Sequence, residues 1–494
     1  MTTHCGKKTE ELIDKLRSSS TGVDVEYRLA SGETRRRIYM DSTASTLQLG
    51  VVKTVMDRYL PYYANTHTDV HFNAKLSTHE FEWAHNMVLD FVDADRDLYT
   101  SFFIGSGATA GINRIAQTLA KKRPERDVVI TTIMEHHSND LPHRANFAEV
   151  VHIPVDSSEQ GMGSIDMDAL KAALEKYGDR VNYVAVTGVS NVTGIVNPIY
   201  DVAELAHQHG TLILVDAAQM AAHVPIKMHG HESAERNLDM IAMSGHKIYA
   251  PGSPGVVVTR RDLFQDVEPV ELGGGMVDDV HIGYYLSTAS FPDREEPGTP
   301  NIAGAIALAS VLYALKKIGM DEIDRREMEL MSYAVERLSM LDEVVVYGRT
   351  DTENCPRTGA VSVNVRDMHH SLTAAILNDY FNIAVRNACF CAHPYVREMI
   401  AEDLEEQLDE LSNEELEAMA ELHRGMVRAS FGVYNTRGDV DALISALQDI
   451  SSNKAQYSDL YEQRSCGNYF HKSFVFDSTE VFSAQREIDR WMAV

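Results

Sequence analysis

Six short apolar runs that alternate with helical segments restrict the fold of this chain more than any other feature of its sequence. The runs occupy residues 128–132, 149–153, 183–187, 212–215, 240–243 and 255–259. Continuous apolar strands of this length are typical of a largely parallel sheet that helices cover on both faces. Helical segments at 166–177 and 200–209 fit between them. We therefore expect one large α/β domain over residues 41–300, with ligands bound beyond the carboxyl ends of its strands.

The pattern changes after a helix expected at 301–317. Helices then mix with short strands such as 360–365, which predicts a smaller α+β domain over residues 301–450. Residues 1–40 are expected to form an N-terminal arm that contributes to this smaller domain. Residues 451–494 are expected to form a polar and aromatic C-terminal extension.

The composition argues against several classes of partner. A net charge of -28 would repel the phosphates of nucleic acids and of anionic membranes. Five cysteines at irregular spacing argue against a disulfide framework and fit a reducing cytosol. No apolar stretch follows the first charged residues, so no signal peptide is expected, and the apolar run at 303–315 predicts a buried helix too short to cross a bilayer. We expect a cytoplasmic protein that binds neither nucleic acid nor membrane.

A lysine and a carboxylate follow two neighbouring runs. Lys247 ends the segment Ser-Gly-His-Lys after the run at 240–243, and Asp216 follows the run at 212–215. A pyridoxal phosphate enzyme needs this pairing, because a lysine holds the cofactor aldehyde as a Schiff base and an acid keeps the pyridine nitrogen protonated. Lys247 and Asp216 are therefore candidates for binding pyridoxal 5'-phosphate.

Further short blocks accompany this pair along the chain. In chain order, the blocks are 39–41, 107–113, 134–139, 189–191, 215–219, 244–247, 298–301, 386–391, 428–430 and 434–436. With these blocks the chain resembles the class V aminotransferase family, and most closely its cysteine desulfurase branch. The resemblance implies fold type I of the pyridoxal phosphate enzymes, in which a large domain with a mostly parallel sheet between helices accompanies a smaller α+β domain.

The resemblance also implies how the cofactor phosphate is held. Ala108 and Thr109 open a helix, where backbone amides and a hydroxyl meet the positive end of the helix dipole. Ser244 and His246 are expected as further phosphate ligands. Thr299, which also precedes a helix, resembles a threonine that the family contributes from the neighbouring subunit. A homodimer with shared active sites is therefore expected.

Other residues are expected around the cofactor ring by the same resemblance. Gln219 should hydrogen-bond the phenolic oxygen, and Asn191 should contact the ring or the substrate carboxylate side. His136 is assigned to stacking on the ring, with His137 as the other candidate. Adjacent histidines cannot easily ligate one metal ion, and no H-x-x-x-H or paired C-x-x-C accompanies them, so no metal site is expected.

Cys391 follows Arg386 by five residues, as the nucleophilic cysteine does in the desulfurase segment. Only a thiolate is nucleophilic enough, so nearby positive charge must lower its pKa. By resemblance, Arg428 holds the carboxylate of L-cysteine, Lys247 removes the α proton, and Cys391 takes the substrate sulfur as a persulfide while L-alanine forms. An acceptor protein would then receive the sulfur. His67 lies in a segment similar to the family's substrate-access segment, although its next two residues replace the usual arginine and glycine.

Other class V activities stay open. The Cys389-Phe390-Cys391 segment looks equally like one in molybdenum cofactor sulfurases. A selenocysteine lyase, a C-S lyase, an epimerase and an aminotransferase would use the same cofactor. A non-catalytic interaction module is a further alternative, against which the intact Lys247, Asp216 and Gln219 argue.

Residues 395–427 depart from the family as an acidic helical insertion. Between residues 398 and 421 there are 11 acidic residues and no basic one. One helical face is marked by Ile400, Leu404, Leu408 and Leu411. A second helix is expected to start at the capping box of Ser412 and Glu415. Charge runs usually face solvent, which favours an acidic surface hairpin, and a lid or docking element beside the active cysteine is the alternative.

Overall fold

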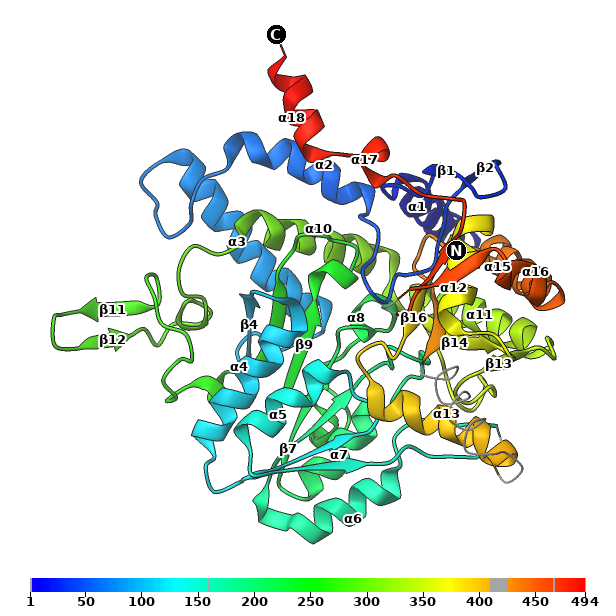
Figure 1. Cartoon of the computed structure of the whole chain (residues 1–494). Coiled ribbons are helices and arrows are strands. Elements are labelled where there is room, and N and C mark those ends of the chain that lie inside the picture. Colours follow the sequence, from blue (N-terminus) through cyan, green and yellow to red (C-terminus); the bar gives the residue numbers. More distant parts are fainter. Residues whose placement is uncertain (1, 159, 409–424, 465–466, 494) are drawn as a thin grey trace.

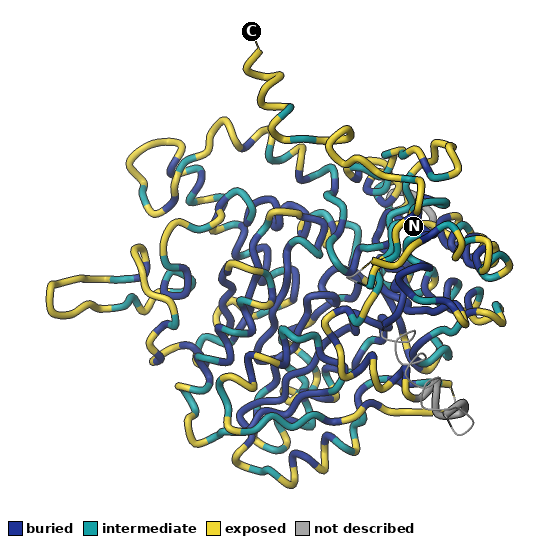
Figure 2. Tube along the Cα trace, in the orientation of Figure 1, coloured by how far each residue is buried: buried dark blue, intermediate teal, exposed yellow. Residues whose placement is uncertain are grey.

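The computed structural model describes residues 2–158, 160–408, 425–464 and 467–493. Two main sheets organise this part of the chain, one of seven strands and one of four strands. Helices surround both sheets (Figure 1), and the buried residues gather along the sheets while most helices have one exposed side (Figure 2).

The seven-stranded sheet forms the centre of the larger part. Its strands are β4 (Tyr99–Ile104), β5 (Val128–Thr132), β6 (Glu149–Ile153), β7 (Val181–Thr187), β8 (Leu212–Asp216), β9 (Met240–Ser244) and β10 (Gly255–Arg260). Their order across the sheet is β4-β10-β9-β8-β7-β5-β6. The pairs from β9 to β6 are parallel, and β10 runs antiparallel to both of its neighbours. The expected, largely parallel sheet is therefore confirmed.

Helices cover both faces of this sheet. The covering helices are α3 (Phe72–Phe91), α4 (Gly107–Lys122), α5 (Leu141–Asn146), α6 (Met167–Tyr177), α7 (Ile199–Gln208), α9 (Arg261–Phe264) and α10 (Ile302–Ile318). Strand β8 contributes side chains to both faces of the sheet. Ile213 and Val215 belong to the core that includes α3, α6, α7 and α10, whereas Leu214 belongs to the core under α4. Alternate side chains of a strand point to opposite faces, so both faces must be apolar.

The four-stranded sheet forms the centre of the smaller part. Its strands are β13 (Val344–Val346), β14 (Ala360–Val365), β16 (Arg386–Ala388) and β17 (Met426–Ser430), and they are antiparallel in the order β13-β14-β17-β16. Three helices pack on this sheet, namely α11 (Met320–Ser339), α12 (His370–Phe381) and α15 (Arg437–Ser452). The two parts together confirm the expected fold of type I. The exact domain boundaries stay a prediction.

The N-terminal region attaches to the smaller part. Strand β3 (Ile38–Tyr39) pairs in parallel with β15 (Ile383–Ala384), and Asp41 forms a bridge with Ser430. The elements before and after β3 are α1 (Thr2–Ser19), the hairpin of β1 (Glu26–Arg28) and β2 (Thr34–Arg36), and α2 (Gly50–Tyr59). This attachment brings the chain after β3 beside the strand that carries Arg428.

The remaining elements lie outside the strands of the two main sheets. They are α8 (Met220–His223), the hairpin of β11 (Val277–Val280) and β12 (Tyr285–Ser287), α13 (His393–Leu408), α16 (Lys454–Ser458), the hairpin of β18 (Tyr461–Gln463) and β19 (Tyr469–His471), α17 (Ser478–Val481) and α18 (Ala484–Met492). The expected capping box at Ser412 and the helix after it lie outside the described residues. Among the described residues, no single helix is long and apolar enough to span a bilayer, although the bent pair of α10 and α11 passes on length and composition. Most of α10 is buried, as expected from its apolar sequence.

Candidate active site

A cavity of about 400 Å³ lies beyond the carboxyl ends of β8 and β9. Twelve of the residues expected at the site line it, namely Ala108, Thr109, His136, Asn191, Asp216, Gln219, Ser244, His246, Lys247, Arg386, Cys391 and Arg428. They come from both the larger and the smaller part of the molecule. The structure therefore brings together residues that are up to 320 positions apart, from 108 to 428.

Lys247 and Asp216 lie at the ends of two paired strands. In the parallel register of β8 and β9, Asp216 pairs with Ala242, and Lys247 ends the short 3-10 helix η5 (Gly245–Lys247) that follows β9. Burial lowers the pKa of Lys247 to about 8, and the carboxylate of Asp216 opposes this shift. Burial raises the pKa of Asp216, against the backbone N–H of Ala218 and the charge of Lys247. Burial thus disfavours the charge on each group, and the opposite charge of the other group partly offsets this effect.

The start of α4 forms a cradle of hydrogen-bond donors. Gly107 has φ of +61°, and the backbone N–H of Ala108 donates to Oγ of Ser244 at 2.8 Å. A Cβ atom on residue 107 would lie 2.7 Å from the same Oγ, so only glycine leaves this space open. Thr109 Oγ1 lies 2.7 Å from Oγ of Ser138, which also lines the cavity. A helix start of this kind binds anions such as phosphate.

His136 and His137 have different surroundings. His136 lines the cavity, and its Nδ1 accepts the backbone N–H of Ser138 at 3.0 Å, which leaves the ring proton on Nε2. Burial, and then the charge of Lys247, lower the pKa of His136 to about 4, so the ring is neutral at neutral pH. His137 instead stacks on His393, with ring centroids 4.9 Å apart. His136 is therefore the one that can lie against a cofactor ring.

Glu135 fixes the turn that carries His136. Its buried carboxylate accepts hydrogen bonds from Oγ1 of Thr132 at 2.7 Å, Nδ2 of Asn139 at 2.6 Å and the backbone N–H of Thr187 at 3.1 Å. Burial raises the pKa of Glu135 to about 8, while these donors act in the opposite direction. The turn is thus tied to β5 and β7 at once.

Cys391 lies on a strained turn after β16. Phe390 and Cys391 have φ of +50° and +57°, a conformation that residues with a side chain rarely adopt. Two hydrogen bonds hold the turn: Nδ2 of Asn191 donates to the Phe390 carbonyl at 2.8 Å, and the backbone N–H of His137 donates to the Cys391 carbonyl at 2.8 Å. Cys391 is exposed, whereas Cys389 is half-buried. The turn presents Cys391 at the cavity edge.

Arg428 and Arg386 share the carboxylate of Asp41. Arg428 donates to Asp41 at 3.4 Å and to the carbonyl of Asn191 at 2.9 Å, and Arg386 lies 3.1 Å from the other oxygen of Asp41. The guanidinium of Arg428 also lies over the ring of Phe390, 4.6 Å from its centre. Burial lowers the pKa of Arg428 to about 10, and Asp41 opposes the shift. Nε of Arg428 is buried and has no hydrogen-bond partner among the described residues.

Several polar residues in the cavity wall are not among those expected from the sequence. Asp41, Ser45 and Ser138 line the cavity, and Ser45 Oγ lies 3.3 Å from Nδ1 of His246. Thr43 also lines the cavity, and its backbone carbonyl accepts a hydrogen bond from the side chain of the expected Gln219 at 2.9 Å. Asp41 and Ser138 stand inside the blocks 39–41 and 134–139, so these blocks contained a signal for them.

Thr299 and His67 lie outside this cavity. Both are exposed, and each lines another cavity. Nδ2 of Asn65 donates to Oγ1 of Thr299 at 3.4 Å, so the segment that carries His67 lies beside the one that carries Thr299. Within one chain, neither residue joins the group around Lys247.

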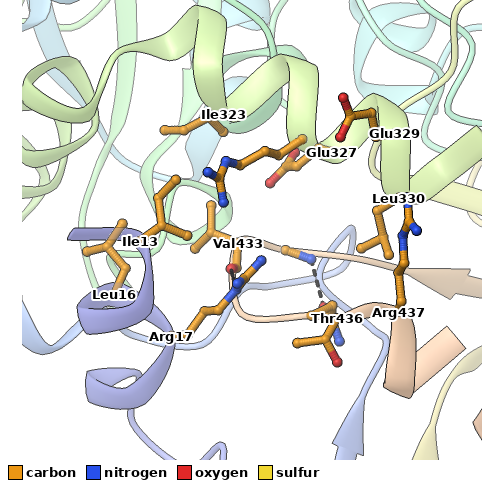
Figure 3. Close-up of a pocket in the computed structure, with 13 residues that line it drawn as sticks. Ile13, Leu16, Arg17, Ile323, Glu327, Glu329, Leu330, Val433, Thr436 and Arg437 are labelled. Carbon is orange, nitrogen blue, oxygen red and sulfur yellow. Dashed lines mark hydrogen bonds between the residues drawn. The ribbon is translucent and has the colours of Figure 1, made fainter. Parts of the chain in front are cut away.

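A separate cavity of about 260 Å³ lies between α1, α11 and the loop after β17 (Figure 3). Its apolar walls include Ile13, Leu16 and Val433, and Nε of Arg17 donates to the Val433 carbonyl at 3.2 Å. It contains none of the residues expected at the active site. The first cavity, which twelve of the expected residues line, is therefore the candidate active site.

The comparison with protein families identifies the class of this chain. The family model described as Aminotransferase class-V matches residues 38–443. The chain belongs to this family, and the resemblance inferred from the sequence blocks is confirmed.

The chain is similar to cysteine desulfurases within the family. A probable cysteine desulfurase of Halalkalibacterium halodurans is 34% identical over 418 residues, which cover 83% of this chain and 92% of that protein. A cysteine desulfurase of Thermococcus onnurineus, solved in its apo form, has a TM-score of 0.71 at 30% identity and covers 84% of this chain and 95% of its own. The cysteine desulfurase CsdA of Escherichia coli has a TM-score of 0.69 at 26% identity, covering 88% and 98%.

Proposed function

We propose that this protein is a pyridoxal phosphate-dependent cysteine desulfurase, which converts L-cysteine to L-alanine and takes the sulfur on Cys391. The observation that carries the proposal is the presence of Lys247, Asp216, Arg428 and Cys391 in the wall of one cavity. The similarity to cysteine desulfurases over most of the chain supports the same reaction.

The residues of the cavity fit pyridoxal phosphate. Lys247 would hold the aldehyde and Asp216 would face the ring nitrogen, while the cradle at Ala108 and Ser244 would hold the phosphate. The space that glycine keeps open at residue 107 supports this fit, since a Cβ atom there would displace the Ser244 hydroxyl. When bound, pyridoxal phosphate supplies an electron sink that acidifies the α carbon of an attached amino acid.

The chain's own residues would bind and orient the substrate. The planar fork of Arg428 matches a carboxylate bidentately, and its Nε finds no acceptor among the described residues. Asp41 now shares that guanidinium, so the substrate carboxylate would compete with Asp41 for it. Arg386 can stay paired with the Asp41 carboxylate while the guanidinium of Arg428 binds the substrate carboxylate instead.

Proton transfer would fall to Lys247. A pKa of about 8 leaves a useful fraction of its amine neutral near neutral pH, and a neutral amine can take the proton from the α carbon. Asp216 would hold a proton on the ring nitrogen throughout. The neutral ring of His136 adds no competing positive charge to the cavity.

Sulfur transfer would fall to Cys391. Its thiolate attacks the sulfur of the substrate, so that a sulfur–sulfur bond forms as the carbon–sulfur bond breaks. The electron pair of the broken bond stays with the carbon skeleton, which is protonated and leaves as L-alanine. The exposed position of Cys391 would then let an acceptor protein reach the persulfide.

We also propose a homodimer with shared sites. Thr299 is expected to serve the phosphate of the neighbouring subunit, and its exposed position beside Asn65 in the single chain is compatible with that role.

Parallel measurement of products tests the proposed function. The holoenzyme is incubated with L-cysteine and a reductant, and sulfide and alanine are quantified together. Equal yields support the proposal. Pyruvate and ammonia in place of alanine would instead identify a C-S lyase, and turnover that persists in Cys391→Ala would identify an aminotransferase or epimerase.

A further inference from the structure

The C-terminal tail, which we define as residues 474–493, exposes a set of large apolar side chains. The members that are more than half exposed are Val475, Phe476, Val481, Phe482, Ile488, Trp491 and Met492. Figures 1 and 2 show that α18 projects from the molecule and is exposed along its length. Trp491 is 85% exposed, although tryptophan is a residue that proteins usually cover.

Helix α18 has an apolar side and a charged side. Ile488, Trp491 and Met492 lie within one side by the helical period of 3.6 residues, and Arg486 and Arg490 lie on the opposite side. Short helices obtain most of their stability from packing an apolar side against another surface. Exposed apolar groups of this extent mark interaction sites in soluble proteins. The apolar side of α18 therefore requires a covering surface.

A second exposed apolar set lies on the segment from residue 60 to residue 72, which we call the access segment. Its members are Leu60, Tyr62, Tyr63, Val70 and Phe72, with Phe72 90% exposed. In Figure 1 the access segment extends from the end of α2, and the tail leaves the molecule on the same upper side. Asn65 joins this segment to Thr299, the residue expected to serve a neighbouring subunit.

We infer that the tail of one copy of this chain packs across the access segment of a second copy. The inference rests on the homodimer in the proposed function and adds a contact in which the tail lies beyond the family match, which ends at residue 443, while the access segment lies within it. Both exposed apolar sets belong to the same chain, and within each set one aromatic ring also has a neighbour in its own chain, Phe476 on Tyr27 and Tyr63 on Tyr59. A two-fold axis therefore lets each tail cover the access segment of the other subunit, which forms the contact twice.

The charges of α18 favour a second copy over other partners. Arg486 and Arg490 are balanced by Glu487 and Asp489, so the helix carries no net charge. A helix that binds anionic membranes would be rich in Lys and Arg on its polar side. The apolar side must be covered in every molecule, and another copy of the chain is always present at equal concentration.

Fluorescence of Trp491 tests whether the tail is covered. The chain has two tryptophans, so Trp83→Phe leaves Trp491 as the only one, and Trp83 itself packs near Tyr313. In the holoenzyme dimer, the emission of Trp491 should be shifted to shorter wavelength and should move to longer wavelength as dilution dissociates the dimer. Emission of a fully hydrated tryptophan in the dimer, or a shift to shorter wavelength that appears only with phosphatidylcholine vesicles, would overturn the inference.

Cross-linking tests which chain covers the tail. Trp491→p-benzoylphenylalanine is prepared in light and heavy-isotope-labelled holoenzyme, and the two are mixed, dissociated and allowed to reassociate. Ultraviolet light should join the tail of one isotope to the access segment of the other. Cross-links confined to one isotope would show that the tail covers its own chain and would overturn the inference.

Two neighbouring substitutions provide the matched comparison. Trp491→Asp should weaken dimer association at least about tenfold in sedimentation equilibrium, because the contact occurs twice in each dimer. Arg490→Asp, which adds the same side chain on the opposite side of α18, should leave association near that of the parent protein. Equal effects of the two variants would overturn the inference. Alanine formation by concentrated holoenzyme tests the proposed function separately, since a dimer that lacks the tail contact retains its active-site residues.

Discussion

Cys391 and Cys389 differ in exposure although they are two residues apart. Cys391 is exposed at the cavity edge, whereas burial raises the pKa of the half-buried Cys389 thiol. A raised pKa leaves less thiolate, so Cys389 is the poorer nucleophile. Cys391→Ala should therefore lower alanine formation from L-cysteine at least about a hundredfold, while Cys389→Ala should retain most of it. The rates of alanine release by the two variants check this, and a larger loss for Cys389→Ala would contradict it.

The pKa of Lys247 sets a pH dependence for cofactor attachment. Only the neutral amine attacks an aldehyde, so attachment to apoprotein should accelerate as pH rises toward about 8 and then level off. Asp216→Asn removes the carboxylate that raises this pKa, and the midpoint should move to lower pH. Absorbance of the attached cofactor measures the rate. A midpoint near the ordinary lysine pKa, or one unaffected by the Asp216 change, would contradict the expected pairing.

At the residue scale, the sequence predicted the groups that carry distinctive chemistry. Lys247, Asp216 and Cys391 stand out because their neighbours along the chain are characteristic. Asp41 does not stand out, because its role comes from two arginines more than 340 positions away, at 386 and 428. Contacts of this kind are set by β3 pairing with β15, which no local pattern indicates.

At the scale of elements, the start of α4 is the most sensitive to substitution. Gly107→Ala would place a Cβ atom 2.7 Å from Oγ of Ser244 and would force a side chain into positive φ. The variant should bind pyridoxal phosphate about tenfold more weakly and lose about 1–2 kcal/mol of stability. Cofactor titration and thermal unfolding measure both effects.

The neighbouring Gly105 is the matched control. A Cβ atom at residue 105 would meet no atom within 4 Å. Gly105→Ala should therefore keep the cofactor affinity of the parent protein. Equal losses in the two variants would contradict the assignment of the cradle to the start of α4.

The expected strands begin and end within two residues of their predicted bounds. Short apolar runs predict strand ends well in a sheet that helices cover on both faces, because the whole run is buried there. Strand β4 escaped prediction because its sequence includes Thr100 and Ser101, which are nevertheless buried. Ser101 satisfies its hydroxyl by donating to the carbonyl of His85 at 3.0 Å. The reversed direction of β10 was also beyond prediction, because an apolar run does not encode direction.

At the scale of the whole molecule, a buried pair ties the two parts together. Nδ1 of His223, on α8, lies 2.5 Å from Oε2 of Glu327, on α11, and both side chains are more than 90% buried. Glu327→Ala would leave His223 buried without this partner and should cost about 3 kcal/mol of unfolding free energy. The exposed Glu329 on the same helix is the control, since Glu329→Ala should cost less than about 0.5 kcal/mol. Denaturant unfolding checks both values, and equal costs would contradict a structural role for the pair.

The arrival of sulfur on Cys391 tests the account most directly. Holoenzyme is incubated with heavy-sulfur L-cysteine without reductant, and its peptides are examined by mass spectrometry. We predict that the peptide containing Cys391 gains one labelled sulfur atom, with one alanine released for each atom gained. The account would be contradicted if alanine formed while the Cys391 peptide gained no heavy sulfur, or if the Cys391→Ala variant still gained heavy sulfur.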